Sequence, residues 1–260
     1  MRELAVVVSD ENTNLSTQEA IDAIAKAGFK NVFIQWYNDN LEFGQEKQLE
    51  YIKELGLNVI FAHLGYQTIN SLWGNNSLGD DLVERYKNDI NICKNNGINM
   101  VIIHLSSGSS VTAFNKLGLD RIQKIADFAK DLNVRVAFEN NKLKGYLEYV
   151  IDNIKNDNVG ICYDSGHCHA YFNDEFDYLK FKNRIFAVHL HDNDKTGDLH
   201  LTPFDGTTDW EAVVCKLKDA GYDGPITLES IYGPSYLKMS PTDFFEKNYQ
   251  VGLEIDKLFI

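Results

Sequence analysis

The sequence predicts a single (β/α)₈ barrel over residues 1–260. Eight short apolar runs recur along the chain, helical patterns separate them, and the 260 residues match the roughly 250 that such a barrel needs. The runs are nearly continuous in hydrophobicity, as expected for parallel strands covered on both faces. Eight serial units fit one closed barrel better than a doubly wound sheet, and no linker rich in Pro, Ser or Gly divides them into two domains.

The apolar runs define the strands. The predicted strands are Leu4–Ser9, Asn31–Trp36, Asn58–His63, Met100–His104, Val134–Glu139, Val159–Asp164, Ile185–His189 and Ile226–Glu229. Helices with a 3.6-residue repeat are expected between them, and Ser16–Ala27 opens with a capping box of Ser16 and Glu19. Three more helices have the apolar stripes Leu49, Ile52 and Leu55; Ile122, Ile125 and Ala129; and Trp210, Val213, Val214 and Leu217.

A glycine stands at four junctions between a helix and the next strand. These are Gly28, Gly56, Gly97 and Gly221, in the segments AGFKNV, LGLNVI, NGINMV and AGYDGPI. Each is expected to end its helix in the left-handed conformation. The recurring order of helix, glycine and strand indicates serial βα units and therefore a parallel sheet.

Composition narrows the function classes. The chain has 25 Lys and Arg against 38 Asp and Glu, a formal charge of −13, which disfavours a nucleic-acid partner because such binding needs cationic side chains. No apolar run approaches the roughly 20 residues that cross a bilayer, and the N-terminus lacks the pattern of a signal peptide. Four cysteines without CxxC spacing suggest reduced thiols in a cytoplasmic protein.

Ionisable residues stand where six consecutive strands stop. They are His63, His104, Glu139, Asp164, His189 and Glu229. In a (β/α)₈ barrel the carboxyl ends of the strands converge on one mouth, where active sites lie. All six are of types that bind metal ions, so we expect a metal centre at this mouth.

Further candidates lie in the loops after two of these strands. His167 follows Asp164 across a short turn that contains glycine, which could bring it back beside Asp164. Asp198 and His200 form an Asp-x-His pair suited to a second metal or to a polyhydroxy substrate. His191 shares strand parity with His189 and is its alternative as a ligand.

The motifs around these residues resemble a known family. They are FEN at 138–140, YDSGH at 163–167, VHLHDN at 188–193, DLHLTPFDGTTDW at 198–210 and LES at 228–230. The chain is similar to the sugar (phosphate) isomerase/epimerase families of the xylose isomerase-like TIM-barrel superfamily, which also contains endonuclease-IV-type AP endonucleases. These motifs span the second half of the chain, whereas the first half matches through its βα rhythm, His63 and His104.

The resemblance implies a ligand set. In the isomerase/epimerase branch one divalent metal (Mn, Zn, Co or Mg) would be held by Glu139, Asp164, His189 and Glu229, with His189 preferred to His191 because the family pattern is H-L-x-D. In the endonuclease branch additional zinc ions would use further positions, and these match His63, His104, His167, Asp198 and His200.

The resemblance also implies a reaction. Glu139 and Glu229 would exchange a proton beside a substrate carbonyl through a metal-stabilised enediolate, and His167 would hold a substrate hydroxyl. Trp36, at the end of the second strand, is expected to stack on the apolar face of the sugar. The expected partner is a small sugar or sugar phosphate, with no nucleic acid favoured, no membrane, and homo-oligomer formation left open.

The loop at 198–210 favours the sugar branch. LTPFDGTTDW is similar to the HLxPGxGxxDW pattern of isomerase-like members, with Phe204-Asp205 as a departure near the usual glycine, whereas the endonucleases continue differently. The alternatives are a phosphodiesterase acting on abasic DNA, a dehydratase or lyase on the same barrel, and a sugar-binding barrel without catalysis.

Overall fold

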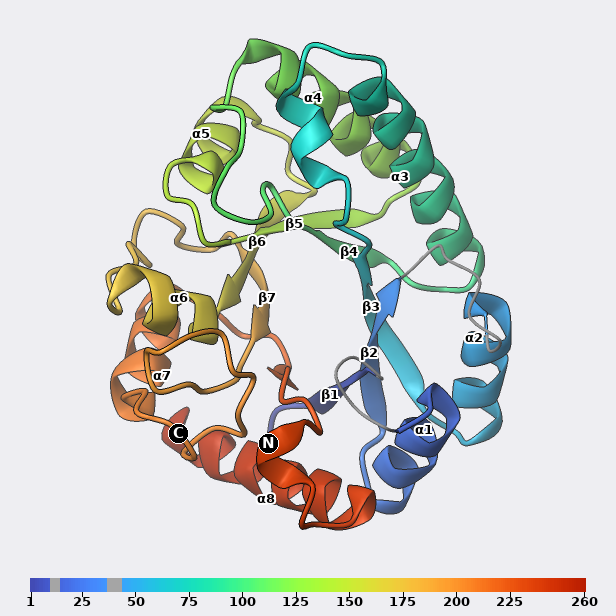
Figure 1. The fold of residues 1–260 in the computed structure, drawn as a ribbon, viewed down its shortest axis with the longest axis vertical. Coiled ribbons are helices and arrows are strands. Elements are labelled where there is room, and N and C mark those ends of the chain that lie inside the picture. Colours follow the sequence, from blue (N-terminus) through green and yellow to red (C-terminus); the bar gives the residue numbers. More distant parts are fainter. Residues whose placement is uncertain (10–14, 37–43) are drawn as a thin grey trace.

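The computed structural model describes residues 1–9, 15–36 and 44–260, and they form the predicted (β/α)₈ barrel (Figure 1). The strands are β1 (Leu4–Val8), β2 (Asn31–Trp36), β3 (Asn58–Leu64), β4 (Met100–Ile103), β5 (Arg135–Glu139), β6 (Val159–Asp164), β7 (Ile185–His189) and β8 (Ile226–Leu228). The α-helices are α1 (Thr17–Lys26), α2 (Gln45–Glu54), α3 (Leu78–Asn95), α4 (Lys116–Asp131), α5 (Tyr146–Asn153), α6 (Ser165–Phe172), α7 (Trp210–Asp219) and α8 (Pro241–Leu258). Two 3₁₀ helices, η1 (Ile69–Trp73) and η2 (Pro234–Tyr236), lie in the loops after β3 and β8.

The strands pair in parallel in the order β7-β6-β5-β4-β3-β2-β1-β8. A parallel bridge between Leu190 and Leu228 then joins the segment after β7 to β8 and brings the two edges of the sheet together. The helices surround this ring of strands (Figure 1). The carboxyl ends of all strands therefore face one mouth, as the sequence predicts.

Local signals in the sequence produce the predicted boundaries. The side chain of Ser16 accepts a hydrogen bond from the Glu19 amide, and the Glu19 carboxylate accepts one from the Ser16 amide, which completes the capping box of α1. Left-handed backbone occurs at all four junction glycines, with φ values of 97°, 72°, 81° and 78° at Gly28, Gly56, Gly97 and Gly221. Every strand begins and ends within one residue of its predicted range.

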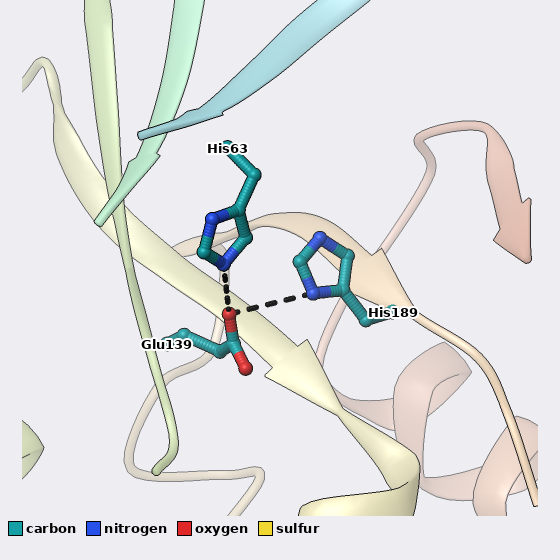
Figure 2. Close-up of side chains that lie close together, drawn as sticks. All are labelled: His63, Glu139 and His189. Atoms are coloured by element: carbon teal, nitrogen blue, oxygen red, sulfur yellow. Dashed lines mark hydrogen bonds and ion pairs between the residues drawn. The ribbon is translucent and has the colours of Figure 1, made fainter. Parts of the chain in front are cut away.

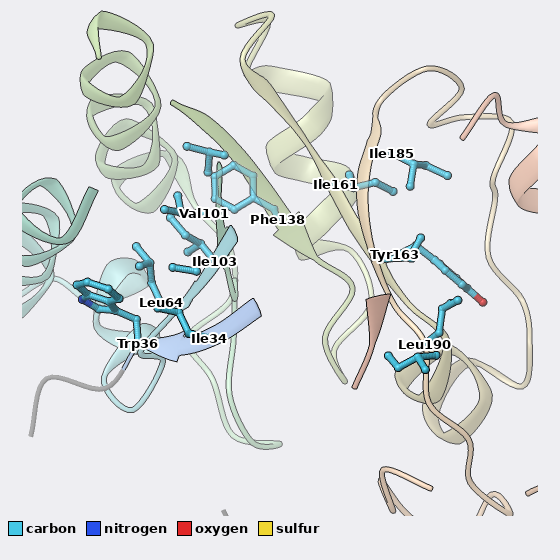
Figure 3. Close-up of a cluster of buried hydrophobic side chains, with 14 of the residues drawn as sticks. Ile34, Trp36, Leu64, Val101, Ile103, Phe138, Ile161, Tyr163, Ile185 and Leu190 are labelled. Carbon is cyan, nitrogen blue, oxygen red and sulfur yellow. The ribbon is translucent and has the colours of Figure 1, made fainter. Parts of the chain in front are cut away.

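Two hydrophobic clusters hold the barrel together. One fills the barrel interior and consists of Val7, Phe33, Phe61, Met100, Ile102, Ala137, Cys162 and Ala187. The other lies between the strands and the surrounding helices, and Figure 3 shows part of it, including Ile34, Leu64 and Phe138. Successive residues of a strand point to opposite faces, so each of β1 to β7 contributes to both clusters.

The inward-facing positions change character at the mouth. In β1 to β7, a polar side chain follows two residues after the last interior apolar residue and lies on the same face: Ser9, Gln35, His63, His104, Glu139, Asp164 and His189. The apolar layer thus forms a floor, and a polar layer lies directly above it. All four cysteines are free thiols, as expected. Each helix within residues 1–9, 15–36 and 44–260 is too short or too polar to cross a bilayer.

Candidate metal centre

Glu139, at the end of β5, lies at the centre of the polar layer. Its Oε2 is 3.1 Å from His63 Nε2 and 3.2 Å from His104 Nε2. The imidazole of His167 approaches the other oxygen, with Nδ1 2.9 Å from Oε1. His189 points to the same Oε2 as His63 (Figure 2). A carboxylate that is 1% exposed therefore has histidine nitrogens on several sides.

His189 links the four ligands that the sequence predicts. Its Nδ1 lies 3.4 Å from Glu139 Oε2, 3.5 Å from Glu229 Oε1 and 3.8 Å from Asp164 Oδ2. The ring is fully buried and stacks on Phe33 of the apolar floor, with ring centroids 5.1 Å apart. Neither ring nitrogen has a hydrogen-bond partner in the part of the chain that the structure describes. A buried imidazole that lacks a hydrogen-bond partner among the described residues and faces three carboxylates fits a divalent cation with mixed nitrogen and oxygen ligands.

His191 lies on the other side of Asp164. Its Nε2 is 3.1 Å from Asp164 Oδ1 and 3.8 Å from Glu229 Oε2, so both histidines of the H-L-H-D segment contact the carboxylate cluster. The ring packs against Gly166, where an added Cβ would lie 1.9 Å from Cε1 of His191. The glycine of the DSGH motif therefore leaves room for the His191 ring.

Asp198 forms another group of possible metal ligands together with nearby histidines. Asp198 Oδ2 is 3.1 Å from His167 Nε2 and 3.6 Å from His200 Nε2. The rings of His191 and His200 stack with centroids 4.1 Å apart. His191, Asp198 and His200 offer ligand atoms within 4.8 Å of one another, as do Glu139, Asp164 and His167. The structure thus gathers every His, Asp and Glu that the sequence singles out.

The two glutamates of the centre have pKa values shifted in opposite directions. Burial would raise the pKa of Glu139, but the neighbouring His104 and His189 outweigh it and hold this pKa well below its usual value. Burial raises the pKa of Glu229 well above its usual value, and the carboxylates of Asp164 and Glu139 add to the effect. Burial opposes the charged form of His200, but Asp198 raises the pKa of His200 to about 10.

The backbone around Asp164 is fixed by local hydrogen bonds. The Asp164 carboxylate caps α6 by accepting a hydrogen bond from the His167 amide at 2.6 Å. The side chain of Asn140 donates to the Asp164 carbonyl and accepts from the Asp164 amide, at 2.9 and 2.7 Å. Asn140 therefore ties the end of β5 to the end of β6 and positions two of the predicted ligands. The FEN motif contains this residue, but its supporting role became apparent only from the structure.

The loop at 198–210 is organised around buried Asp192. The Asp192 carboxylate accepts hydrogen bonds from Trp210 Nε1 at 3.0 Å and from the amides of Phe204 and Thr208 at 3.0 and 3.1 Å. Phe204 has a left-handed φ of 72°, which explains why a glycine suits this part of the loop and why Phe204 is a departure. The loop nevertheless keeps Asp198 and His200 at the centre.

Trp36 does not lie at the mouth. Its side chain is 1% exposed and belongs to the cluster between strands and helices, on the face of β2 opposite Gln35 (Figure 3). This position does not support the expected stacking on a sugar. Two tyrosines lie beside the imidazoles of the centre instead: Tyr66 stacks on His104 with ring centroids 4.3 Å apart, and the Tyr171 ring lies 5.8 Å from that of His167.

Curated relatives share the sequence at low identity. An uncharacterised protein of Sinorhizobium fredii is 28% identical over 191 residues, which are 68% of this chain and 60% of that protein, so the chain spans less than two thirds of its length. An inosose isomerase of Bacillus licheniformis is 22% identical over 94% of each chain. A probable endonuclease 4 of Mycoplasma capricolum is 29% identical over 125 residues, which are 40% of this chain and 43% of that protein.

Solved structures share the fold over the whole chain. The IolI protein with a bound zinc atom superposes with a TM-score of 0.77 at 16% identity, covering 99% of each chain. A D-allulose 3-epimerase from Methylomonas sp. in complex with D-allulose superposes with a TM-score of 0.76 at 18% identity, covering 100% of this chain and 97% of that one. At identities this low, the structural similarity shows a common fold alone. A family model described as a xylose isomerase-like TIM barrel matches residues 21–250, and the chain belongs to that family.

Proposed function

We propose that the chain is a divalent-metal-dependent isomerase or epimerase of a small sugar or sugar phosphate. The observation that carries the proposal is the buried His189 imidazole, which lacks hydrogen-bond partners in the described structure and faces three carboxylates. The inosose isomerase and the D-allulose 3-epimerase among the similar proteins support the same reaction class.

The cation would be held by Glu139, Asp164, His189 and Glu229. Their donors are carboxylate oxygens and an imidazole nitrogen, a set that accepts Mn²⁺, Zn²⁺, Co²⁺ or Mg²⁺. When bound, such a cation would polarise the carbonyl and hydroxyl oxygens of the substrate and offset the negative charge that develops during proton transfer.

The chain itself supplies the proton-transfer groups. One carboxylate removes the proton from the carbon beside the substrate carbonyl, and the resulting enediolate takes a proton back at another position or on the other face. We assign these roles to Glu139 and Glu229, because they stand at the ends of β5 and β8 and approach His189 Nδ1 at 3.4 and 3.5 Å. The side chain of His167, which lies beside Glu139, would hold a substrate hydroxyl.

The test combines metal analysis with isotope exchange. Elemental analysis of the purified protein is expected to find a bound divalent metal, and a screen of ketoses, inososes and their phosphates in D₂O is expected to find one that gains deuterium at carbon. Glu139→Gln and Glu229→Gln should lose exchange and turnover while circular dichroism shows an intact fold, whereas the exposed Glu54→Gln should retain both. Turnover near the wild-type rate in either site variant would remove the assigned acid/base pair.

A second candidate function is supported by the additional histidines. His63, His104, His167, Asp198 and His200, the extra positions of the endonuclease-type resemblance, all lie within the same cluster. A phosphodiesterase acting on abasic DNA would bind additional zinc ions and would nick a duplex that contains an abasic site. The formal charge of −13 favours the sugar reaction. A single bound metal and an uncut duplex would exclude the endonuclease.

A further inference from the structure

A cavity of about 450 Å³ lies beside the metal centre. It is lined by the segments that follow β4 and β5, by the first turn of α5, and by the end of α6 with the loop after it. Glu139 and Asn140 form part of its wall, so the cavity shares residues with the centre. Its volume falls within the range of small-molecule sites, about 300–1,000 Å³.

Most of the cavity wall is apolar. The apolar lining residues are Leu105, Leu143, Tyr146, Leu147, Phe172 and Phe176. Among the described residues, Lys144 is the one cation in the lining, and its Nζ lies 3.6 Å from Glu175 Oε2. Glu148 and Asp177 add further negative charge at the wall. This combination disfavours a phosphate or another anion and favours an uncharged, apolar occupant.

Two buried polar atoms of the lining have no partner among the described residues. They are Oγ of Ser106 and Nδ2 of Asn141, whose residues are 2% and 6% exposed. Oδ1 of Asn141 accepts a hydrogen bond from the Leu105 amide at 2.8 Å, which fixes the side chain and leaves its amino group without a partner. Buried polar groups are normally paired, so each of these two atoms is available to hydrogen-bond to a polar group of an occupant.

We propose that this cavity binds an apolar group of the substrate, an aryl ring or a branched alkyl group that carries a hydroxyl or carbonyl oxygen. The proposal rests on the proposed function, since it places the reacting sugar at the metal centre and its apolar substituent in the cavity. Because Glu139 belongs to both the cavity wall and the metal centre, one molecule can reach both. The oxygen of the substituent accepts a hydrogen bond from Asn141 Nδ2 and pairs with the Ser106 hydroxyl.

The first experiment measures binding to the cavity without any turnover. Calorimetric titration of the metal-loaded protein with p-cresol and with p-xylene, which lacks the hydroxyl, is expected to give saturable binding of both. Leu143→Trp, which places a larger side chain in the wall, should abolish both signals, whereas the exposed Leu179→Trp should leave them unchanged. An absence of p-cresol binding, or binding that survives Leu143→Trp, would overturn the proposal.

A separate variant tests the proposed hydrogen bond to the Ser106 hydroxyl. Ser106→Ala should weaken p-cresol binding by about three- to tenfold and leave p-xylene binding unchanged, because only p-cresol can pair with the hydroxyl. Equal affinity of p-cresol for wild type and Ser106→Ala would overturn the assigned hydroxyl contact.

The second experiment tests the link to the metal centre. D-fructose and its mono-O-benzyl ethers serve as probes, and at least one ether should bind more than tenfold more tightly than D-fructose. Leu143→Trp should remove this difference and leave the affinity for D-fructose unchanged. If no ether gains affinity, the cavity is not a substrate subsite. A deuterium-exchanging substrate found by the earlier screen would keep the proposed function intact in that case, so the two failures are distinguishable.

Discussion

The cation should stabilise the fold measurably, because the centre holds carboxylates close together. Ligand atoms of Asp164 lie within 4.8 Å of those of Glu139, and both carboxyls have lowered pKa values. At that separation two unit charges repel by about 3–4 kcal/mol if the effective dielectric constant is about 20. A divalent cation replaces this repulsion with attraction. At a free concentration of 100 times its dissociation constant it adds about 2.7 kcal/mol to the free energy of unfolding.

Thermal unfolding provides the assay. Adding Zn²⁺ or Mn²⁺ to the chelator-treated protein should raise Tm by about 5–10 °C, at roughly 2–4 °C per kcal/mol for a chain of this size. In Glu229→Gln the rise should fall to less than half, because one ligand is lost. The metal-free variant should be as stable as the metal-free wild type, because burial and nearby carboxylates already raise the pKa of Glu229.

The matched control is Glu54→Gln, which removes a carboxylate from an exposed position on α2 and should keep the full rise. An equal rise in Glu229→Gln and wild type would refute the assigned ligand, and no rise in wild type would refute a cation at this site.

Three further predictions concern the region of η1 and α4. Arg121 donates hydrogen bonds to four carbonyls of residues 71–76 and to Asp80, so Arg121→Met should lower the free energy of unfolding in urea by about 3 kcal/mol. The hydrogen bond from Arg121 lowers the pKa of Asp80 below its usual 3.8. The wild type should therefore be more stable than Asp80→Asn by the full amount above pH 3.8, and this difference should vanish as the pH falls through the lowered pKa. A difference that persists in acid would contradict the pairing. Gly118→Ala would place a Cβ 2.1 Å from Cε3 of buried Trp73 and should cost about 1–2 kcal/mol by the same assay, and a neutral effect would contradict this close contact.

The strand ends were predictable because two signals coincide there. A parallel strand of a barrel is apolar on both faces, so its last apolar residue marks its end clearly. Side chains two residues apart share a face, so Glu139 follows Ala137 and Asp164 follows Cys162 on the interior side. Convergence of His and carboxylate side chains at the mouth then follows from barrel closure alone.

The alternation of side chains along a strand does not determine the roles or partners of individual residues. His189 and His191 have equal parity and both contact Asp164, so no periodic pattern separates their roles. On β2 both faces are apolar, and hydrophobicity gives no sign that Trp36 faces the helices and Gln35 the interior. The amino group of Asn141 has no partner among the described residues because the side chain is fixed by a hydrogen bond from Leu105, which is 36 residues away and lies in the segment after β4.

The central claim is that Glu139, Asp164, His189 and Glu229 hold one cation in common. The most direct measurement is a crystal structure of the Zn²⁺-loaded protein with an anomalous difference map at the zinc edge. The account predicts a peak bonded to all four side chains, with distances of roughly 2.0–2.2 Å. A fully loaded protein with no peak between these side chains, or with its zinc bound elsewhere, would contradict it.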